Sequence, residues 1–321
     1  MDRRRFLLTS LASALATPFG VEAQPATRRL GWLELATAAA SAHNQQILRA
    51  ALRERGWSDS QIVFESVVAE GRAERLPMLV AELLSRKVAI IVAAGTTAIR
   101  AAKDGTNTIP IVMMGGGDPV GTGLVQSIAR PGGNVTGVSL LGKELSEKTF
   151  DLIKQTLPSI KTLVLIRAAA NPANLFFLDQ FDAAGRRLGV TVTAVDIRDP
   201  EEFPGAFSRI RADAGFILLD PMFFPHRVWI AQLAVQRRLP LVSANRSYAE
   251  AGLLFTHGFQ YDEVVRAAAP YIDKILRGAR PGDLPIEQPN KLDLAINLKT
   301  AKALGLTIPP SLLARADQVI E

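Results

Sequence analysis

The sequence predicts an α/β protein made of two Rossmann-like lobes, each built around a parallel sheet. Three observations support this prediction. The chain has 321 residues, whereas a single domain usually holds about 100–150. From Arg29 onward, short apolar runs alternate with amphipathic stretches. The second half of the chain then repeats the pattern of the first.

In the first half, apolar runs bounded by turn residues predict strands that are buried on both faces of a parallel sheet. These runs are Arg29–Leu35, Ile62–Val68, Val88–Ala93 and Ile109–Met114. Helical patterns lie between them, at Asn44–Arg55, Leu76–Arg86 and Thr97–Lys103. Strict alternation of strand and helix predicts a doubly wound sheet with right-handed crossovers.

In the second half, a predicted strand at Leu163–Ile166 leads into a predicted helix at Pro172–Leu188. Gly189 follows this helix as Gly56 follows the first one, and glycine commonly ends a helix in this way. The repeated order predicts two similar lobes, one after the other. The alternative that any two αβ segments look alike stays open.

Composition excludes several kinds of site. The chain has no cysteine, so it has no disulfide, thiolate metal site or cysteine nucleophile. His43, His226 and His257 are far apart and show no metal-ligand spacing. The net charge of +6 comes from basic residues interleaved with acids, so we expect no nucleic-acid partner. We expect no metal, no cofactor and no catalytic residue.

Residues 1–23 read as a cleavable export signal. Arg3, Arg4 and Arg5 precede an apolar stretch, and Val21-Glu22-Ala23 fits a cleavage site. The string Arg-Arg-Arg-Phe-Leu is similar to a twin-arginine signal, and an ordinary Sec signal stays open as the alternative. Since no cysteine is available for lipidation, we expect a soluble periplasmic protein without a lipid anchor or membrane insertion after signal removal.

Polar residues follow the predicted strands, and open parallel sheets bind ligands beyond the carboxyl ends of their strands. If two lobes face each other, these loops converge on one cleft. The predicted ligand-binding residues are Thr96, Thr97, Asp118, Pro119, Asn171, Asp220, Met222, Arg246 and Tyr248.

Each kind of position also has a plainer structural explanation. Thr96 or Thr97 can cap a helix, Asp118 can cap a turn, and Arg246 can form a surface ion pair. The Gly115-Gly116-Gly117 loop is neither a dinucleotide fingerprint nor a phosphate-binding loop. No nucleophile or metal motif of a known hydrolase occurs.

Several long strings identify a resemblance. They include Gly-Asp-Pro-Val-Gly-Thr-Gly-Leu-Val at 117–125, Ala-Arg-Pro-Gly-Gly-Asn-Val-Thr-Gly at 129–137, and the segments 271–289 and 296–309. From about residue 28 to its end, the chain resembles the ABC-transporter substrate-binding family that includes tryptophan-binding (TrpX-like) proteins.

The resemblance implies a type I periplasmic-binding fold with a three-strand hinge. Lobe one would comprise 28–139 and 257–283, and lobe two 140–254 and 288–321. It also implies a ligand between the lobes, contacted by Thr96, Thr97, Asp118 and Asp220. Gly115-Gly116 replace bulkier residues of the family, which implies a roomier pocket.

These implications predict the solute-binding component of an ABC importer, a monomer with a permease and an ATPase as partners. The ligand would be a small, aromatic or amino-acid-like molecule, bound in the cleft between the lobes. Two alternatives stay open: a binding protein that feeds a membrane receptor, and an enzyme on a doubly wound sheet. A DNA-binding repressor would need an N-terminal helix-turn-helix where the export signal stands.

Overall fold

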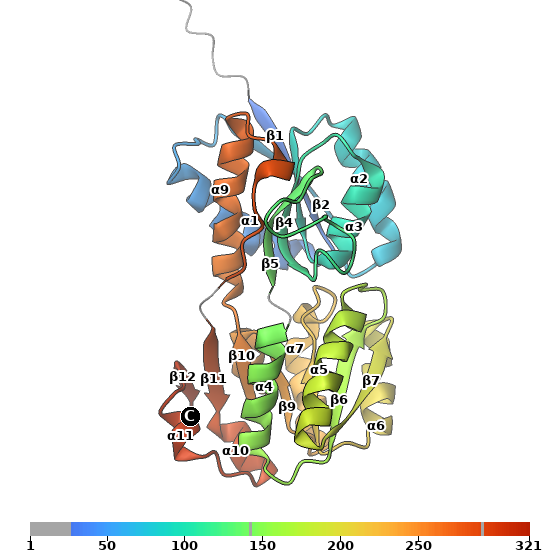
Figure 1. Ribbon diagram of the computed structural model, residues 1–321, viewed down its shortest axis with the longest axis vertical. Helices are drawn as coiled ribbons and strands as arrows, with labels where there is room; N and C mark the ends of the chain where they lie inside the picture. The colour runs from blue at the N-terminus through green and yellow to red at the C-terminus, as the bar shows by residue number, and fades with distance from the viewer. Residues whose placement is uncertain (1–26, 141–142, 290–291) are drawn as a thin grey trace, which may run out of the picture.

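The computed structural model describes residues 27–140, 143–289 and 292–321. They form two α/β lobes stacked along the long axis of the molecule, as Figure 1 shows. The predicted two-lobed α/β fold is therefore confirmed. The predicted export signal at 1–23 lies outside the described residues. Within the described ranges, no helix is long and apolar enough to cross a bilayer.

The sheet of lobe one is parallel and has the strand order β2-β1-β3-β4-β5. Its strands are β1 (Arg28–Glu34), β2 (Ile62–Val68), β3 (Ile90–Ala94), β4 (Ile111–Gly117) and β5 (Val135–Leu140). All of β3 and β4 is buried, because helices cover both faces of the sheet. This burial explains why these strands read as continuous apolar runs.

The helices of lobe one divide between the two faces of its sheet. They are α1 (Ala38–Arg53) and α9 (Tyr261–Leu276) on one face, and the short η1 (Ala73–Arg75), α2 (Leu76–Ser85) and α3 (Thr96–Gly105) on the other. Alternate residues of β1 serve the two faces: Leu30 and Trp32 pack toward α1 and α9, and Leu33 packs toward α2 and α3. This is the alternation that a strand requires.

The sheet of lobe two has the order β12-β11-β10-β9-β8-β6-β7. Its strands are β6 (Thr162–Ala168), β7 (Thr191–Ile197), β8 (Ala214–Ile217), β9 (Leu241–Ser243), β10 (Phe255–Gly258), β11 (Asp293–Asn297) and β12 (Gln318–Ile320). The described pairs are parallel except for β10 with β11. This exception has a simple cause, because β10 ends at the hinge and β11 begins there.

The helices of lobe two also cover both faces of its sheet. One face carries α4 (Lys143–Thr156), α5 (Asn174–Leu188), α10 (Leu298–Leu304) and α11 (Pro310–Leu313). The other carries η2 (Pro200–Glu202), α6 (Phe203–Arg209), η3 (Phe224–His226) and α7 (Arg227–Gln236). The short α8 (Arg246–Glu250) follows β9.

The chain passes between the lobes after β5, after β10 and before β11. The last passage first runs along the free edge of β5, after η4 (Pro281–Asp283). There the amide of Ser139 donates to the carbonyl of Glu287 at 2.9 Å, and the amide of Glu287 donates to the carbonyl of Gly137 at 3.1 Å. These passages bring both lobes to one waist.

Two boundaries differ from those predicted. Residues 257 and 258 were expected in lobe one, but they complete β10, which pairs with β9 and β11 in the sheet of lobe two. Residues 284–287 extend the returning segment of lobe one beyond 283, because they hydrogen-bond to β5 and to Tyr271 of α9. In the sequence, Gly258 alone marks the end of β10, and Pro281 and Gly282 suggest an earlier end for the returning segment than the structure shows.

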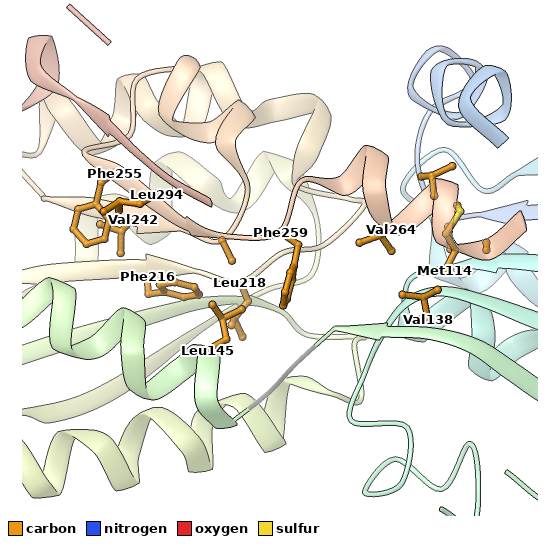
Figure 2. Close-up of a cluster of buried hydrophobic side chains, with 14 of the residues drawn as sticks. Met114, Val138, Leu145, Phe216, Leu218, Val242, Phe255, Phe259, Val264 and Leu294 are labelled. Carbon is orange, nitrogen blue, oxygen red and sulfur yellow. The ribbon is translucent and has the colours of Figure 1, made fainter. Parts of the chain in front are cut away.

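Apolar packing is continuous through the waist. Figure 2 shows Phe259, which follows β10, between two groups of buried side chains, and its ring points toward Leu145 and Leu218 of lobe two. Val264 and Met114 of lobe one lie on its other side. Phe259 is 3% exposed, so the hinge has a buried apolar centre.

Candidate functional site

A cavity of about 720 Å³ lies between the two lobes. Its walls come from the carboxyl ends of strands in both sheets: β1, β3, β4 and β5 in lobe one, and β6, β8, β9 and β10 in lobe two. This is the edge at which doubly wound sheets bind ligands. The volume lies within the range of about 300–1,000 Å³ that is usual for small-molecule sites.

Aromatic side chains form much of the cavity wall. They are Phe177, Phe181, Phe216, Phe224, Tyr248, Phe259 and Tyr261. The rings of Phe181 on α5 and Phe216 on β8 have centroids 4.7 Å apart, and Phe150 on α4 packs behind Phe181 at 5.9 Å. Such a wall is held rigid by its own packing and suits a flat apolar ligand.

Lobe one contributes a buried carboxylate, that of Glu34 at the end of β1. It is 3% exposed and lines the cavity. The indole Nε1 of Trp32 donates to its Oε2 at 3.0 Å, and the amide of Asn44 on α1 donates to its Oε1 at 3.1 Å. Burial raises the pKa of Glu34, and hydrogen bonds from Trp32, Ser41 and Asn44 oppose that rise.

Lobe two contributes a second buried carboxylate, that of Asp220 after β8. It is 5% exposed. The backbone amide of Met222 donates to its Oδ1 at 3.0 Å, and the side-chain amide of Asn171 donates to its Oδ2 at 3.0 Å. Burial raises the pKa of Asp220, against the effect of these two hydrogen bonds.

Tyr248, which lines the cavity near Asp220, carries a buried hydroxyl. Tyr248 on α8 is fully buried, and its hydroxyl has no hydrogen-bond partner among the described residues. Burial and the nearby Asp220 raise its pKa. An unpaired buried hydroxyl costs about 1–3 kcal/mol, so a ligand that pairs with it would recover that cost.

Two arginines line the cavity, and both are partly exposed. Arg246 on α8 forms a bidentate pair with the buried Asp293 on β11, with Nε 2.8 Å from Oδ2. The guanidinium of Arg227 lies 4.5 Å from the centroid of the Phe224 ring and donates to the carbonyl of Phe224. Both guanidinium groups therefore have partners within lobe two.

The structure places Thr96, Asn171, Asp220, Arg246 and Tyr248 around the cavity, and their role in ligand binding stays a prediction. Their contacts also fit the plainer explanations. The hydroxyl of Thr96 accepts the amide of Gly117 at 2.9 Å, and Arg246 has its ion pair.

The structure does not place Thr97, Asp118, Pro119 or Met222 on the cavity wall. The strand β4 continues through the glycines to Gly117, with an irregularity after Met114, so the following loop turns back into lobe one. Asp118 there has a φ of 33° and accepts the amide of Gly121 at 2.9 Å, which is a turn. Thr97 lies one residue past the edge on α3, and Met222 is buried beneath Asp220.

Gly115 has a φ of 78°, which favours glycine, and both it and Gly116 have close neighbours. A Cβ on Gly115 would lie 3.3 Å from the Tyr261 ring, and one on Gly116 would lie 2.9 Å from Cδ1 of Ile99. Tyr261 lines the cavity and fills the space that a larger residue at 115 would take. Small residues at this point therefore admit an aromatic residue of α9 to the wall.

Several wall residues were missed by sequence reasoning. They are Glu34, Asn44, Thr149, Phe177, Phe181, Phe216 and Tyr261. Glu34 had a signal, since an acid ends an otherwise apolar strand. The phenylalanines had none, because residues on a helix face or inside a strand read as ordinary core.

The two lobes touch at the outer side of the cavity. A Cβ on Gly95 would lie 3.1 Å from Cγ of Pro221. A Cβ on Gly117 would lie 3.0 Å from Cβ of Ala173 and 3.0 Å from Cε2 of Phe177. These glycines of lobe one therefore allow lobe two to approach closely, and the lobes enclose the cavity between them.

In the described part of the chain, no group of three or more histidine, aspartate or glutamate residues is placed to hold a metal ion. His257 on β10 is buried and contacts the hydroxyl of Thr149 at 3.0 Å. Thr149 lines the cavity, whereas His257 lies behind it.

Residues 38–320 match the family described as ABC transporter substrate binding protein. A tyrosine-binding protein of Clostridioides difficile is 26% identical over 260 residues, which are 80% of this chain and 74% of that protein. An ABC domain from Streptococcus pneumoniae, solved in complex with L-Trp, superposes with a TM-score of 0.86 at 24% identity, over 92% of this chain and 100% of that one.

A conserved domain protein from Vibrio cholerae gives the same TM-score of 0.86 at 26% identity. The superposition covers 91% of this chain and 99% of that one. Leucine-binding LivK from Thermotoga maritima, at 13% identity and a TM-score of 0.56 over 78% of this chain and 81% of that one, has the same general fold.

Proposed function

Because the chain belongs to the ABC transporter substrate-binding protein family, we propose that it binds a small aromatic molecule between its lobes and delivers it to an ABC importer. The observation that supports this most is the cavity of about 720 Å³ with an aromatic wall drawn from both lobes. The tyrosine-binding and tryptophan-bound relatives support an aromatic ligand.

The proposed mechanism is a shift between open and closed forms. A ligand that contacts both walls does so fully only when the lobes are closed, so it stabilises the closed form by its differential affinity. Phe259 and the segment 284–287 lie at the waist, where such a motion would pivot. The closed surface would then dock on the permease.

The proposed partners are a membrane permease and an ATPase, and the proposed location is the periplasm. The basic and apolar pattern of residues 1–23 supports export. We propose that the mature protein works as a soluble monomer without a lipid anchor, and that it catalyses no reaction.

Thermal-shift screening of the mature protein tests the binding proposal. Aromatic amino acids, amines and acids should be compared with aliphatic amino acids and sugars. A ligand at a hundred times its Kd raises apparent stability by about 2.7 kcal/mol. Melting that responds to no small molecule would contradict the proposal, as would turnover of a screened compound.

A matched pair of variants on α5 locates the site. Phe177→Ala removes a ring from the cavity wall, whereas Leu175→Ala truncates a side chain that is 64% exposed and not part of the wall. We expect Phe177→Ala to weaken binding about tenfold, a loss of about 1.4 kcal/mol, and Leu175→Ala to leave it unchanged. Equal effects of both would place the site elsewhere.

Uptake of the identified ligand by cells that lack the gene tests the transport proposal. Loss of uptake, restored by the wild-type gene but not by a variant that cannot bind, is the expected result. Unchanged uptake with a lost transcriptional or behavioural response would favour a receptor-linked binding protein instead.

A further inference from the structure

The buried ionisable side chains of the cavity wall are acidic, and the basic ones are partly exposed. Among the described wall residues, the acidic or basic side chains with less than a tenth of their surface exposed are Glu34 and Asp220. They come from opposite lobes, so closure places two carboxylates around one enclosed space. Burying a carboxylate is costly unless a positive charge or several hydrogen bonds accompany it.

Among the described residues, neither carboxylate is paired with a cation. Glu34 accepts from an indole, an amide and the Ser41 side chain, and Asp220 accepts from an amide and a backbone N–H. Of the wall arginines, Arg246 is neutralised by Asp293 and Arg227 stacks on Phe224.

The remaining ionisable wall residues lie at the rim. His43 and Asp262, 3.6 Å apart, have side chains that are 64% and 61% exposed, and Glu250 is exposed. The buried interior therefore holds two carboxyl groups without a positive partner among the described residues, and a positively charged ligand group would offset the cost of their burial.

A second, independent feature points to a ligand at the same place. The hydroxyl of Tyr248 is fully buried beside Asp220 and has no partner in the described residues. A ligand ammonium group that approaches Asp220 would come near this hydroxyl, and a small shift of the wall would bring the two into contact. The Asp220 carboxylate would then balance the positive charge of the ammonium group, and the Tyr248 hydroxyl oxygen would accept one of its hydrogen bonds.

We infer that the cavity selects an aromatic amine with a net positive charge, whose nitrogen groups face Glu34 and Asp220, over the matching zwitterion or acid. This inference rests on the proposed function, since it assumes an aromatic ligand in the cavity. A zwitterion brings a carboxylate into an interior that already holds two. An aromatic acid brings only the repulsive charge.

Titration calorimetry with three indoles of matched ring and chain tests the inference. Tryptamine carries only the amine, L-tryptophan carries amine and carboxylate, and indole-3-propionic acid carries only the carboxylate. Tyramine, L-tyrosine and 3-(4-hydroxyphenyl)propionic acid repeat the series on a phenol. We expect the amine to bind about tenfold or more tightly than the amino acid, the size of one charge-assisted hydrogen bond, and the acid to bind least.

Isosteric variants identify the residues responsible. Glu34→Gln and Asp220→Asn should each lower the ratio of amine to acid affinity by about tenfold to a hundredfold. Glu74→Gln and Asp179→Asn remove a charge from an exposed residue of lobe one and of lobe two, away from the wall, and should leave the ratio unchanged. If a wall variant fails to fold, the order of the wild-type affinities decides alone.

Each outcome separates the inference from the proposed function. If the amino acid or the acid binds more tightly than the amine, the inference is wrong, whereas the proposed binding of an aromatic molecule still holds. An unchanged ratio in both wall variants also overturns it. Failure of every member of both series to bind overturns the inference and the proposed aromatic ligand together.

Discussion

At the scale of single residues, Tyr248 and Tyr271 offer a comparison of satisfied and unsatisfied hydroxyls. The Tyr271 hydroxyl donates to the carbonyl of Pro285 at 2.8 Å and accepts the amide of Glu287 at 3.0 Å. The Tyr248 hydroxyl is equally enclosed but has no partner in the described chain. One hydroxyl ties α9 to the segment 284–287 at the hinge, and the other is unpaired beside Asp220.

Removing these two hydroxyls should have opposite consequences. Tyr248→Phe should leave the free energy of unfolding unchanged or raise it by about 1 kcal/mol, because no hydrogen bond is lost, while Tyr271→Phe should lower it by about 1–2 kcal/mol. Urea denaturation of the ligand-free protein measures both. Tyr248→Phe should also weaken ligand binding, and equal destabilisation by the two variants would contradict the assignment.

His257 makes stability depend on pH. Burial lowers the pKa of His257 from 6.5 to about 4. The positive charges of Lys148 and Arg315 add to this effect, and the negative charges of Asp293 and Asp317 oppose it. A histidine with a lowered pKa binds its proton more readily in the unfolded chain. Its contribution to stability is therefore complete above pH 6.5 and is lost as the pH falls toward 4.

The loss should reach about 3 kcal/mol over that interval. Urea denaturation between pH 7 and pH 4 of wild type and His257→Gln measures it, since the glutamine does not titrate. The raised pKa values of Glu34 and Asp220 act in the opposite sense and are common to both proteins. Parallel stability curves for the two proteins would contradict the prediction.

At the scale of elements, Gly117 at the end of β4 sets how closely the lobes approach. Its missing Cβ leaves room for Ala173 and Phe177 of the opposite lobe. Gly133 is a matched comparison, because a Cβ there would meet nothing within 4 Å. Both glycines lie in lobe one, but only Gly117 faces lobe two.

Gly117→Val should therefore impair closure without unfolding either lobe. We expect ligand affinity to fall about tenfold or more, as 1.4 kcal/mol of contact is lost from the closed form, and Gly133→Val to bind normally. Calorimetry gives the affinity. In small-angle scattering with saturating ligand, the Gly117→Val protein should have a larger radius of gyration than the Gly133→Val protein. If Gly117→Val with ligand is as compact as the wild type and binds with normal affinity, the lobes accommodate the added side chain and the prediction is wrong.

Sequence reasoning located the strands well and some helix starts poorly. The run Val88–Ala93 corresponds to β3 at Ile90–Ala94, because strands buried on both faces are apolar throughout. In contrast, α1 was expected from Asn44 but begins at Ala38. Its first turns contain Ala-Ala-Ala-Ser, which have no apolar periodicity to mark a helix face.

For the site, the position of the polar loops was predictable and their direction was not. Asp220 and Asp118 both follow strands, yet only Asp220 lines the cavity. The difference depends on the unforeseen continuation of β4 through three glycines. The roles of Phe181 and Phe216 could not be predicted either, because the sequence does not distinguish an aromatic residue that lines a cavity from one in the core.

At the scale of the whole molecule, the absence of cysteine makes a covalent lock simple to test. An ideal Cβ on Gly117 lies 3.0 Å from that of Ala173, across the cleft. Disulfides need Cβ atoms about 3.5–4.5 Å apart, so a small outward adjustment would fit the bridge. Gly117→Cys with Ala173→Cys should therefore link the lobes close to the closed form, apart by the small distance that a side chain at 117 requires.

The oxidised double variant should hold bound ligand much longer than the reduced one. Stopped-flow release, with and without reductant, measures this. Each single variant serves as a control and should not respond to reductant. Equal release rates in a fully oxidised sample would mean that ligand exchange does not require the lobes to part.

The interleaved path of the chain has a consequence for its synthesis. Lobe one is complete only when α9 and residues 284–287 are added, yet the ribosome must first produce all of β6 to β10. Val264, Ala268 and Ile272 of α9 are fully buried in the finished protein. Until they emerge, the nascent chain presents the apolar patch that they later cover. Lobe one therefore matures late, and the uncovered patch leaves the nascent chain prone to aggregation until translation is nearly over.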